Sequence, residues 1–256
     1  MSASSINLSG KKGLVIGLAN ERSLAYGVAK AAREMGAELV TTCLNDKARK
    51  YVQPLTDELG VTLLNCNVEE ENALADVVDA AVAELGRLDF VVHSIAWAPL
   101  ADLHGRIIDS SAEGFAKAMT ISCHSFAELG RLCAPHMPHG GSMITMSYIG
   151  SEQAIPNYGI MGPIKAALES TVRYMALELG GENIRVHAVS AGPIPTRASS
   201  GLPDLDGLLH LAESKAPMKR LVSLDEVSGL SAFLCTDQAS GMTGQTLFVD
   251  AGYHIA

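Results

Sequence analysis

The sequence predicts an α/β protein with a single-domain, Rossmann-type doubly wound parallel sheet of about seven strands and helices on both faces. Short apolar runs alternate with longer segments of helical periodicity along the whole chain. The length of 256 residues, 48% of them hydrophobic, fits one large core. No repeat or linker divides the chain, so we expect one dinucleotide-binding and catalytic domain over residues 1–256.

The apolar runs predict the strands in chain order. They are residues 13–18, 38–44, 61–66, 90–94, 142–147, 185–190 and 246–249. The expected helices are residues 23–35, 46–59, 70–85, a segment capped by Ser111 that runs toward Cys133, about 157–179, and 224–234. Residues 191–222 read as irregular, and their Pro, Gly and Ser content predicts a mobile substrate lid around 191–217.

Charge and composition exclude several classes of function. A net charge of −9 and a pI near 5.3 leave no surface to neutralise a phosphate backbone, which argues against a nucleic-acid partner. No stretch approaches the roughly 20 apolar residues of a membrane span. The beginning of the chain lacks the pattern of a secretory signal, so we expect a cytoplasmic protein.

Cysteine and histidine spacing predicts neither disulfides nor a metal. The five cysteines include no C-x-x-C pair, and their odd number and wide spacing suit reduced thiols in the cytosol. The eight histidines form no H-x3-H or H-E-x-x-H arrangement. His93 follows an apolar run and is expected to be a core histidine with satisfied hydrogen bonds.

The first strand leads into a turn of small residues. Gly17, Ala19 and Gly27 open the way from strand to helix, where a backbone can approach a pyrophosphate at a helix N-terminus. The G-x-G-x-x-G fingerprint is absent, and glycines that only punctuate a turn explain the pattern equally well. Leu44, at the end of the second strand, offers no charge to a 2′-phosphate, although Lys47 or Arg49 lies within reach of it. This favours NADH over NADPH.

Tyr158 and Lys165 are the candidate catalytic pair. Seven residues are close to two helical turns, so the pattern predicts that both side chains project from one face of a helix. The lysine can then hold the nicotinamide ribose while the phenol donates to an oxygen that becomes negative. A chance pair on a buried helix is the competing interpretation. Its position after the fifth strand, at the carboxyl edge of the sheet, favours a functional pair.

Several motifs in order resemble the bacterial NADH-dependent enoyl-acyl-carrier-protein reductases of the short-chain dehydrogenase/reductase superfamily. The resemblance covers essentially the whole chain. The motifs are Tyr158-x6-Lys165, residues 146–150 (Met-Ser-Tyr-Ile-Gly), 154–158 (Ala-Ile-Pro-Asn-Tyr), 93–95 (His-Ser-Ile), 191–194 (Ala-Gly-Pro-Ile) and 248–253 (Phe-Val-Asp-Ala-Gly-Tyr). The resemblance implies reduction of a trans-2-enoyl thioester on acyl carrier protein, by hydride transfer to its β-carbon, in the last step of type II fatty acid elongation. It also implies a homotetramer.

The resemblance assigns roles to individual residues. Tyr158 would bind the enolate oxygen, Tyr148 would be a second active-site tyrosine, and Lys165 would hold the ribose. Ala98 matches a substrate-contacting position, and Met161 is the methionine expected to touch the acyl chain. With Leu44 and Lys165, the expected cofactor contacts are Gly17, Ser23, Leu24, Asn67, Val68, Ser94, Ile95, Ile194, Pro195, Thr196, Arg197 and Ala198.

This chain departs from the family pattern at a few of these positions. Asn67 stands where the family commonly has Asp, and Leu44 where it has Gln or a basic residue. Ala96 replaces a common Gly, and Gly159 a common Asn. Pro163 is compatible with a helix only if that helix starts near residues 159–160.

Two other functions fit the same fold. A carbonyl reductase, for 3-ketoacyl or other substrates, would carry a tyrosine four residues before the lysine, but that position is Met161. A catalytically silent nucleotide-binding regulator is possible on this fold. The joint presence of Tyr148, Tyr158 and Lys165 argues against it.

Overall fold

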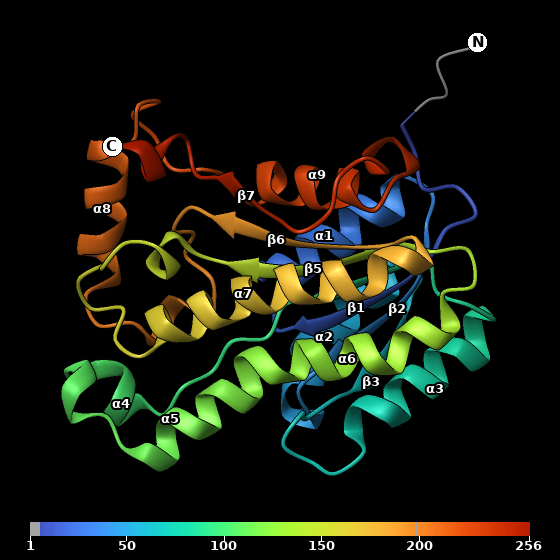
Figure 1. Cartoon of the computed structure of the whole chain (residues 1–256), viewed down its shortest axis with the longest axis horizontal. Coiled ribbons are helices and arrows are strands. Elements are labelled where there is room, and N and C mark those ends of the chain that lie inside the picture. The colour runs from blue at the N-terminus through green and yellow to red at the C-terminus, as the bar shows by residue number, and fades with distance from the viewer. Residues whose placement is uncertain (1–5, 198) are drawn as a thin grey trace.

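One parallel sheet organises the chain (Figure 1). The structure, a computed structural model, describes residues 6–197 and 199–256. Its seven strands lie in the order β3-β2-β1-β4-β5-β6-β7, and every neighbouring pair is parallel. The predicted fold class is thereby confirmed. The order of the strands reverses between β1 and β4, which is where doubly wound sheets open a crevice for ligands.

The elements follow the predicted alternation. The strands are β1 (Lys12–Leu18), β2 (Glu38–Cys43), β3 (Thr62–Asn65), β4 (Phe90–His93), β5 (Gly141–Ser147), β6 (Ile184–Ala191) and β7 (Gln245–Val249). The α-helices are α1 (Leu24–Glu34), α2 (Asp46–Leu59), α3 (Ala73–Leu85), α4 (Leu100–His104), α5 (Ala112–Met119), α6 (Ser125–Cys133), α7 (Met161–Leu179), α8 (Leu205–Lys215) and α9 (Leu224–Leu234).

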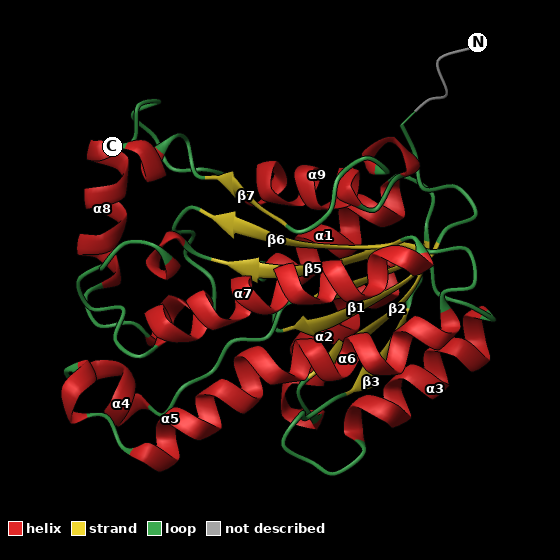
Figure 2. Ribbon diagram, viewed as in Figure 1, coloured by secondary structure: helices red, strands yellow, loops and turns green. Residues whose placement is uncertain are grey.

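Helices cover both faces of the sheet (Figure 2). Helices α3, α6 and α7 lie in front of it in that view and contact one another in sequence, α3 with α6 and α6 with α7. Helices α1 and α9 pack together on the opposite face. The central strands are therefore buried on both sides, as their near-continuous apolar runs require.

Local sequence signals set several of the helix ends. The Ser23 side chain caps α1 by accepting a hydrogen bond from the backbone N–H of Tyr26. Asn45 caps α2 in the same way, and Gly60 ends that helix in the left-handed conformation. Helix α9 begins with a capping box between Ser223 and Glu226. These caps explain why the predicted bounds of α2 and α9 agree with the structure.

The structure corrects the expected start of α7. The helix begins at Met161 and not near residue 157, because Asn157 and Gly159 have positive φ angles of 62° and 55°. Tyr158 therefore lies in the turn before the helix. The prediction that Tyr158 and Lys165 share one helix face is wrong. Pro163 falls in the first turn of α7, where its missing N–H costs no helical hydrogen bond.

Two α-helices lie in segments for which no helix was expected. Within residues 191–222, α8 begins after Asp204, whose carboxylate accepts a hydrogen bond from the N–H of Gly207. The loop that follows β4 contains the short helix α4. The helix expected from Ser111 toward Cys133 is interrupted by a π-helical turn at Thr120–His124, between α5 and α6.

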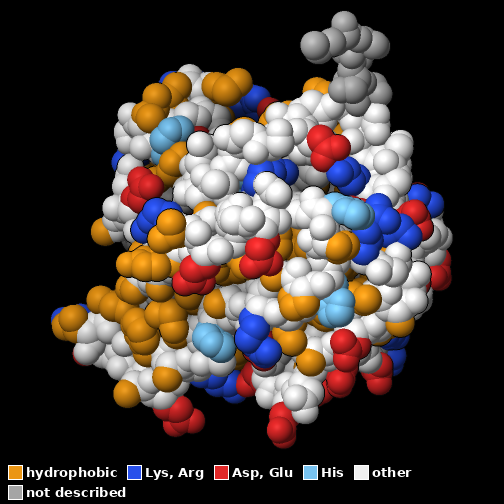
Figure 3. Space-filling view, turned by 45° about the vertical axis from the view of Figure 1, so that its right-hand side comes forward, with side chains coloured by type: hydrophobic (Ala, Val, Ile, Leu, Met, Phe, Trp, Pro, Cys, Tyr) orange, Lys and Arg blue, Asp and Glu red, His pale blue; other side chains and the backbone are white. Residues whose placement is uncertain are grey.

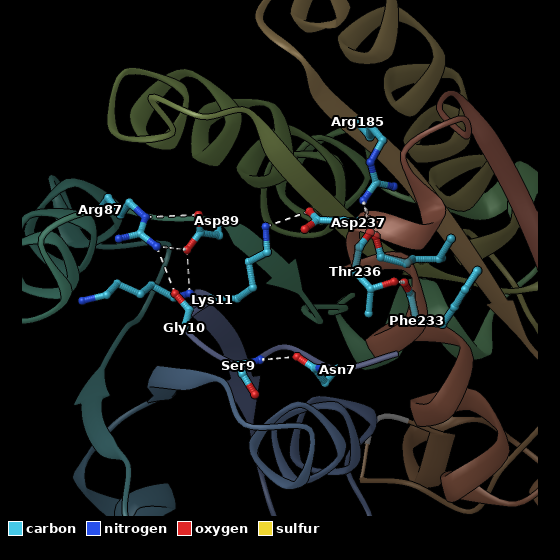
Figure 4. A network of polar contacts seen from close by, with 12 residues as sticks. Asn7, Ser9, Gly10, Lys11, Arg87, Asp89, Arg185, Phe233, Thr236 and Asp237 are labelled. Atoms are coloured by element: carbon cyan, nitrogen blue, oxygen red, sulfur yellow. Dashed lines mark hydrogen bonds and ion pairs between the residues drawn. The ribbon is translucent and has the colours of Figure 1, made fainter. Parts of the chain in front are cut away.

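Polar contacts close the amino edge of the sheet (Figure 4). Arg87 donates to the carbonyl of Gly10 and to the carboxylate of Asp89, which also accepts from the backbone N–H of Lys12. Lys11 pairs with Asp237 at 2.7 Å. Arg87 and Asp89 thus tie the start of β1 to the segment before β4, and Lys11 ties it to the turn after α9. The opposite, carboxyl edge is left open to the loops that carry the site.

Candidate active site

Tyr148 and Tyr158 meet at the carboxyl edge of the sheet. Tyr148 directly follows β5, and Tyr158 reaches it from the turn before α7. Their ring centroids are 4.8 Å apart in an edge-to-face arrangement. Both side chains are buried among apolar neighbours. The turn, and not the predicted common helix face, brings the second tyrosine to the site.

Two glycines shape the space around Tyr158. A Cβ atom on Gly150 would lie 2.4 Å from the ring of Tyr158, so only glycine lets the ring pack against this backbone. Gly159 has a φ of 55°, and a Cβ atom there would lie 2.5 Å from the carbonyl oxygen of Leu103. Glycine at this position therefore avoids the strain that a Cβ atom would bring to the turn.

Lys165 points into the interior from the first turns of α7. Its Nζ donates a 2.7 Å hydrogen bond to the carbonyl oxygen of Met146, the one acceptor that the described residues give it. Two N–H donors of the ammonium remain for a ligand. Burial lowers the pKa of Lys165 to about 8, while the nearby Cys123 and Glu169 act in the opposite direction. The side chain is therefore mostly protonated at neutral pH.

Burial keeps both phenols protonated. It raises the pKa of Tyr158 far above its ordinary value, and the neighbouring Tyr148 and Glu169 raise it further. Burial also raises the pKa of Tyr148, with smaller contributions from Tyr253 and Asp250. The buried Tyr148 hydroxyl has no hydrogen-bond partner within the described part of the chain. A buried hydroxyl without a partner costs free energy, so this site calls for a ligand oxygen or a water.

The turn after β1 is built for close backbone approach. Gly17 has a φ of 104°, and a Cβ atom there would lie 2.3 Å from the carbonyl oxygen of Ser94. The Ser23 hydroxyl accepts from the N–H of Ala19 and donates to the carbonyl of Asn20, which fixes the loop at the N-terminus of α1. Leu24 is the first residue of that helix. These features fit a pyrophosphate-containing cofactor.

The end of β2 offers little to a 2′-phosphate. The Leu44 side chain is 53% exposed. Arg49 is engaged, because it donates to the side-chain oxygens of Asn65 and Gln53. Asn65 in turn donates to the Asp46 carboxylate at 2.6 Å. Lys47 is exposed and remains the cation that could turn toward a phosphate.

The remaining expected cofactor positions follow β3, β4 and β6 at the same edge. Asn67 donates to Glu70 and accepts from the N–H of Glu69, so its side chain stabilises the turn that also carries Val68. Ser94 and Ile95 come directly after β4. The segment after β6 carries Ile194, Pro195, Thr196 and Arg197, and Thr196 bonds reciprocally with Ser199. Ala198 lies outside the described residues.

The substrate side contains a residue that the sequence did not reveal. Ser122, in the π-helical turn, accepts a hydrogen bond from the Trp97 N–H and donates one to the Trp97 carbonyl, at 2.8 and 2.9 Å. It thereby fixes the backbone next to Ala98, which is buried, as is Met161. Lys117 lies 5.0 Å from the centre of the Trp97 ring. Only a π-helical insertion places Ser122 here, and nothing in the periodicity signals one.

His93 is a core residue, as predicted. Its two ring nitrogens lie 3.0 Å from the Thr145 hydroxyl and 2.9 Å from the Ser125 hydroxyl. Burial and the nearby Lys165 lower its pKa to about 3, so the ring is neutral.

In residues 6–197 and 199–256, no group of three or more His, Cys, Asp or Glu side chains is arranged to hold a metal ion. Over the same residues, no helix is long and apolar enough to span a membrane.

Comparisons with known proteins converge on one family. The family model described as enoyl-(acyl carrier protein) reductase matches residues 17–254. A curated relative from Rhizobium meliloti (strain 1021), an NADH-type enoyl-[acyl-carrier-protein] reductase, is 44% identical over 96% of this chain and 91% of its own length. The Anaplasma phagocytophilum enoyl reductase, solved in complex with NAD, superposes with a TM-score of 0.93 at 42% identity, over 97% of this chain and 95% of that one. The Bacillus cereus enoyl reductase, solved with NADP+ and an indole naphthyridinone, gives 0.94 at 38% identity, over 97% and 98%.

Proposed function

Because this chain belongs to the enoyl-(acyl carrier protein) reductase family, we propose that it reduces trans-2-enoyl thioesters on acyl carrier protein with NADH. This reaction is the last step of type II fatty acid elongation. The observation that carries the proposal is the buried Tyr148–Tyr158 pair at the carboxyl edge of the sheet, with the buried Lys165 hydrogen-bonded to the backbone two residues before Tyr148. A phenol that burial keeps protonated can donate a hydrogen bond to a thioester oxygen.

The proposed cofactor site extends from the end of β2 to the end of β6. Gly17, Ser23 and Leu24 would hold the pyrophosphate, while Leu44, Asn67 and Val68 would contact the adenosine. Ser94, Ile95, Lys165 and residues 194–198 would line the nicotinamide end. When bound, the cofactor supplies a hydride. Lys165 would contribute its two uncommitted N–H donors to the ribose hydroxyls and a positive charge beside the ring.

The two tyrosines act on different parts of the substrate. Hydride arrival at the β-carbon moves charge onto the thioester oxygen, and the Tyr158 hydroxyl donates a hydrogen bond to the developing enolate. Tyr148, whose hydroxyl needs a partner, lies against Tyr158 and contacts the acyl end of the substrate together with Ala98 and Met161. With Tyr158 at the thioester oxygen and Tyr148 at the acyl end, the substrate is held in one orientation.

Apolar side chains at the open edge fit an acyl substrate. The segment from α4 toward α5 exposes Leu100, Ile107 and Ile108, at 62, 43 and 71%. Hydrophobic side chains gather at the lower left of the space-filling view, at the height where α4 lies in Figure 1 (Figure 3). We assign residues 191–217, which include α8, to a substrate lid over this edge. Acyl carrier protein is the expected carrier of the substrate.

We further propose a cytoplasmic homotetramer. Tyr174 and Leu177 on α7 are 66 and 79% exposed, and large apolar side chains on one helix face favour burial against another subunit. All five cysteines are free thiols, which suits a reducing compartment. Light scattering after size-exclusion chromatography measures the mass directly, and Leu177→Lys is expected to shift it toward smaller species.

The substrate test separates this proposal from carbonyl reduction. Purified protein is mixed with NADH or NADPH and either a trans-2-enoyl or a 3-ketoacyl thioester, and loss of reduced cofactor is followed by absorbance. We expect turnover of the enoyl thioester with NADH and little turnover of it with NADPH. Turnover of the 3-ketoacyl thioester alone contradicts it, and that outcome would assign the chain to the carbonyl reductases despite Met161.

A further inference from the structure

Glu169 is a buried carboxylate that the proposed reaction does not use. It follows Lys165 by one helical turn on α7, and only 4% of Glu169 and 5% of Lys165 is exposed. Removing a carboxylate from water is costly unless it accepts hydrogen bonds or faces a positive charge. Glu169 is therefore placed here at a cost that a purely apolar residue would avoid.

The carboxylate holds the end of β5. Its Oε1 accepts a hydrogen bond from the Ser147 hydroxyl. Ser147 lies between Met146, whose carbonyl accepts from the Lys165 ammonium, and Tyr148, which packs against Tyr158. Three consecutive residues thus connect Glu169, Lys165 and the tyrosine pair. A shift of Ser147 would move both the acceptor of Lys165 and the ring of Tyr148.

Glu169 is also the negative charge that faces Lys165. The other titratable groups that interact with the ammonium come from two separate elements. His93 on β4 is neutral, and the Cys123 thiol in the π-helical turn has a pKa raised by burial. With these groups uncharged at neutral pH, Glu169 supplies the opposing charge inside α7.

We propose that Glu169 is a positioning residue of the active site, which holds the end of β5 through Ser147 and balances the charge of the Lys165 ammonium. It touches neither cofactor nor substrate in the proposed arrangement and acts through Lys165. The inference rests on the proposed function only in that Lys165 binds the nicotinamide ribose. It deepens that function by explaining why a lysine buried in this site keeps its proton near neutral pH.

The first test titrates Lys165 in the protein without cofactor. Protein labelled with ¹³C-lysine is followed by NMR against pH, and the Lys165 signal is assigned with Lys165→Met. Glu169→Gln is expected to lower the pKa of Lys165 by roughly one unit, a tenfold change in its protonation equilibrium. Glu178→Gln, at an exposed position of the same helix, is the matched control and is expected to leave the titration unchanged. Glu169→Asp retains the charge and is expected to titrate as the wild type.

The second test measures NADH dissociation constants by fluorescence. The ratio between Glu169→Gln and wild type is expected to be near one at pH 6 and to rise toward about tenfold by pH 9, because the variant loses its lysine charge at lower pH. Ser147→Ala keeps the charge and is expected to weaken NADH binding at all pH values without moving the Lys165 titration. This variant decides the question if Glu169→Gln does not fold.

An unchanged Lys165 titration in folded Glu169→Gln overturns the inference, as does unchanged NADH affinity in Ser147→Ala. Failure of the wild-type protein to bind NADH contradicts the proposed function instead. The NMR comparison requires no cofactor and stands apart from that outcome.

Discussion

Individual side chains at this site owe their chemistry to burial. Tyr158 and Tyr148 are kept protonated because water is excluded around them, and Lys165 titrates near pH 8 for the same reason. All three residues could be identified from the sequence, by their spacing and by the resemblance of their motifs to the enoyl reductase family. The sequence could not identify Ser122 or Glu169 as partners of the site, because a reciprocal bond to Trp97 and a contact to Ser147 depend on packing that no periodicity encodes.

Removing one hydroxyl tests the role of Tyr158. Tyr158→Phe is expected to lower kcat by about 100-fold, because the developing oxyanion loses its donor, with little change in the KM for NADH. Tyr51→Phe, at a side chain that is 67% exposed, is the control and is expected to match the wild type. Steady-state kinetics with an enoyl thioester measure both variants. A Tyr158→Phe enzyme with wild-type kcat would remove this tyrosine from the mechanism.

Lys165 is expected to set the alkaline limit of cofactor binding. Its charged form exists below its pKa of about 8, so NADH affinity is expected to be constant from pH 6 to 7 and to fall above pH 8. The two tyrosines are not expected to change the NADH affinity over this pH range, since burial raises the pKa of each. Fluorescence titration of NADH across pH 6–10 provides the measurement. Affinity that is flat to pH 10 would contradict the assignment of Lys165 to the cofactor.

At the scale of elements, sequence patterns predicted the strands well and the loops poorly. Strand positions follow from apolar runs buried on both faces, and capped helices such as α2 and α9 have strong local signals. The start of α7 was misplaced because Asn157 and Gly159 adopt left-handed backbone conformations. Helix α8 was missed, since its cap Asp204 also has a positive φ and its flanks are rich in Pro and Gly.

In the conformation that the turn before α7 adopts here, a Cβ atom at position 159 is expected to be unfavourable. Gly159→Ala places a Cβ atom 2.5 Å from the Leu103 carbonyl in a residue with a φ of 55°, which costs about 1–2 kcal/mol or displaces Tyr158. We expect kcat to fall about 10- to 100-fold. Gly180→Ala, where an added Cβ atom meets no neighbour within 4 Å, is the control. Kinetics and thermal unfolding of both variants distinguish loss of geometry from loss of stability.

At the scale of the whole molecule, the fold class, the single sheet and the carboxyl-edge position of the site were all predictable. These features depend on the alternation of strands and helices, and the sequence pattern that predicts this alternation extends along the whole chain. Strand order and the closure of the amino edge by Arg87, Asp89 and Lys11 were not predictable, because the contacts involved join residues far apart in sequence. The structure supplies that long-range information.

Whole-molecule stability is expected to fall in mild acid. In the folded protein the pKa of His93 is lowered to about 3, while the unfolded chain takes up that proton near pH 6.5. Protons therefore bind preferentially to the unfolded state, and the free energy of unfolding is expected to drop between pH 7 and pH 5 by about 2 kcal/mol from this residue. Denaturant titrations measure the drop. His93→Gln cannot titrate, and an equally steep pH dependence in that variant would argue against this cause.

Hydride transfer to the β-carbon of an enoyl thioester defines the reaction proposed for this protein. The most direct measurement supplies NADH deuterated at the transferred position, with a trans-2-enoyl thioester in ordinary water, and locates the label in the product by NMR and mass spectrometry. We expect one deuterium at the β-carbon and a solvent proton at the α-carbon of a saturated thioester. Deuterium bound at a carbonyl carbon, or an enoyl thioester returned unlabelled beside intact NADH, would contradict the proposed reaction.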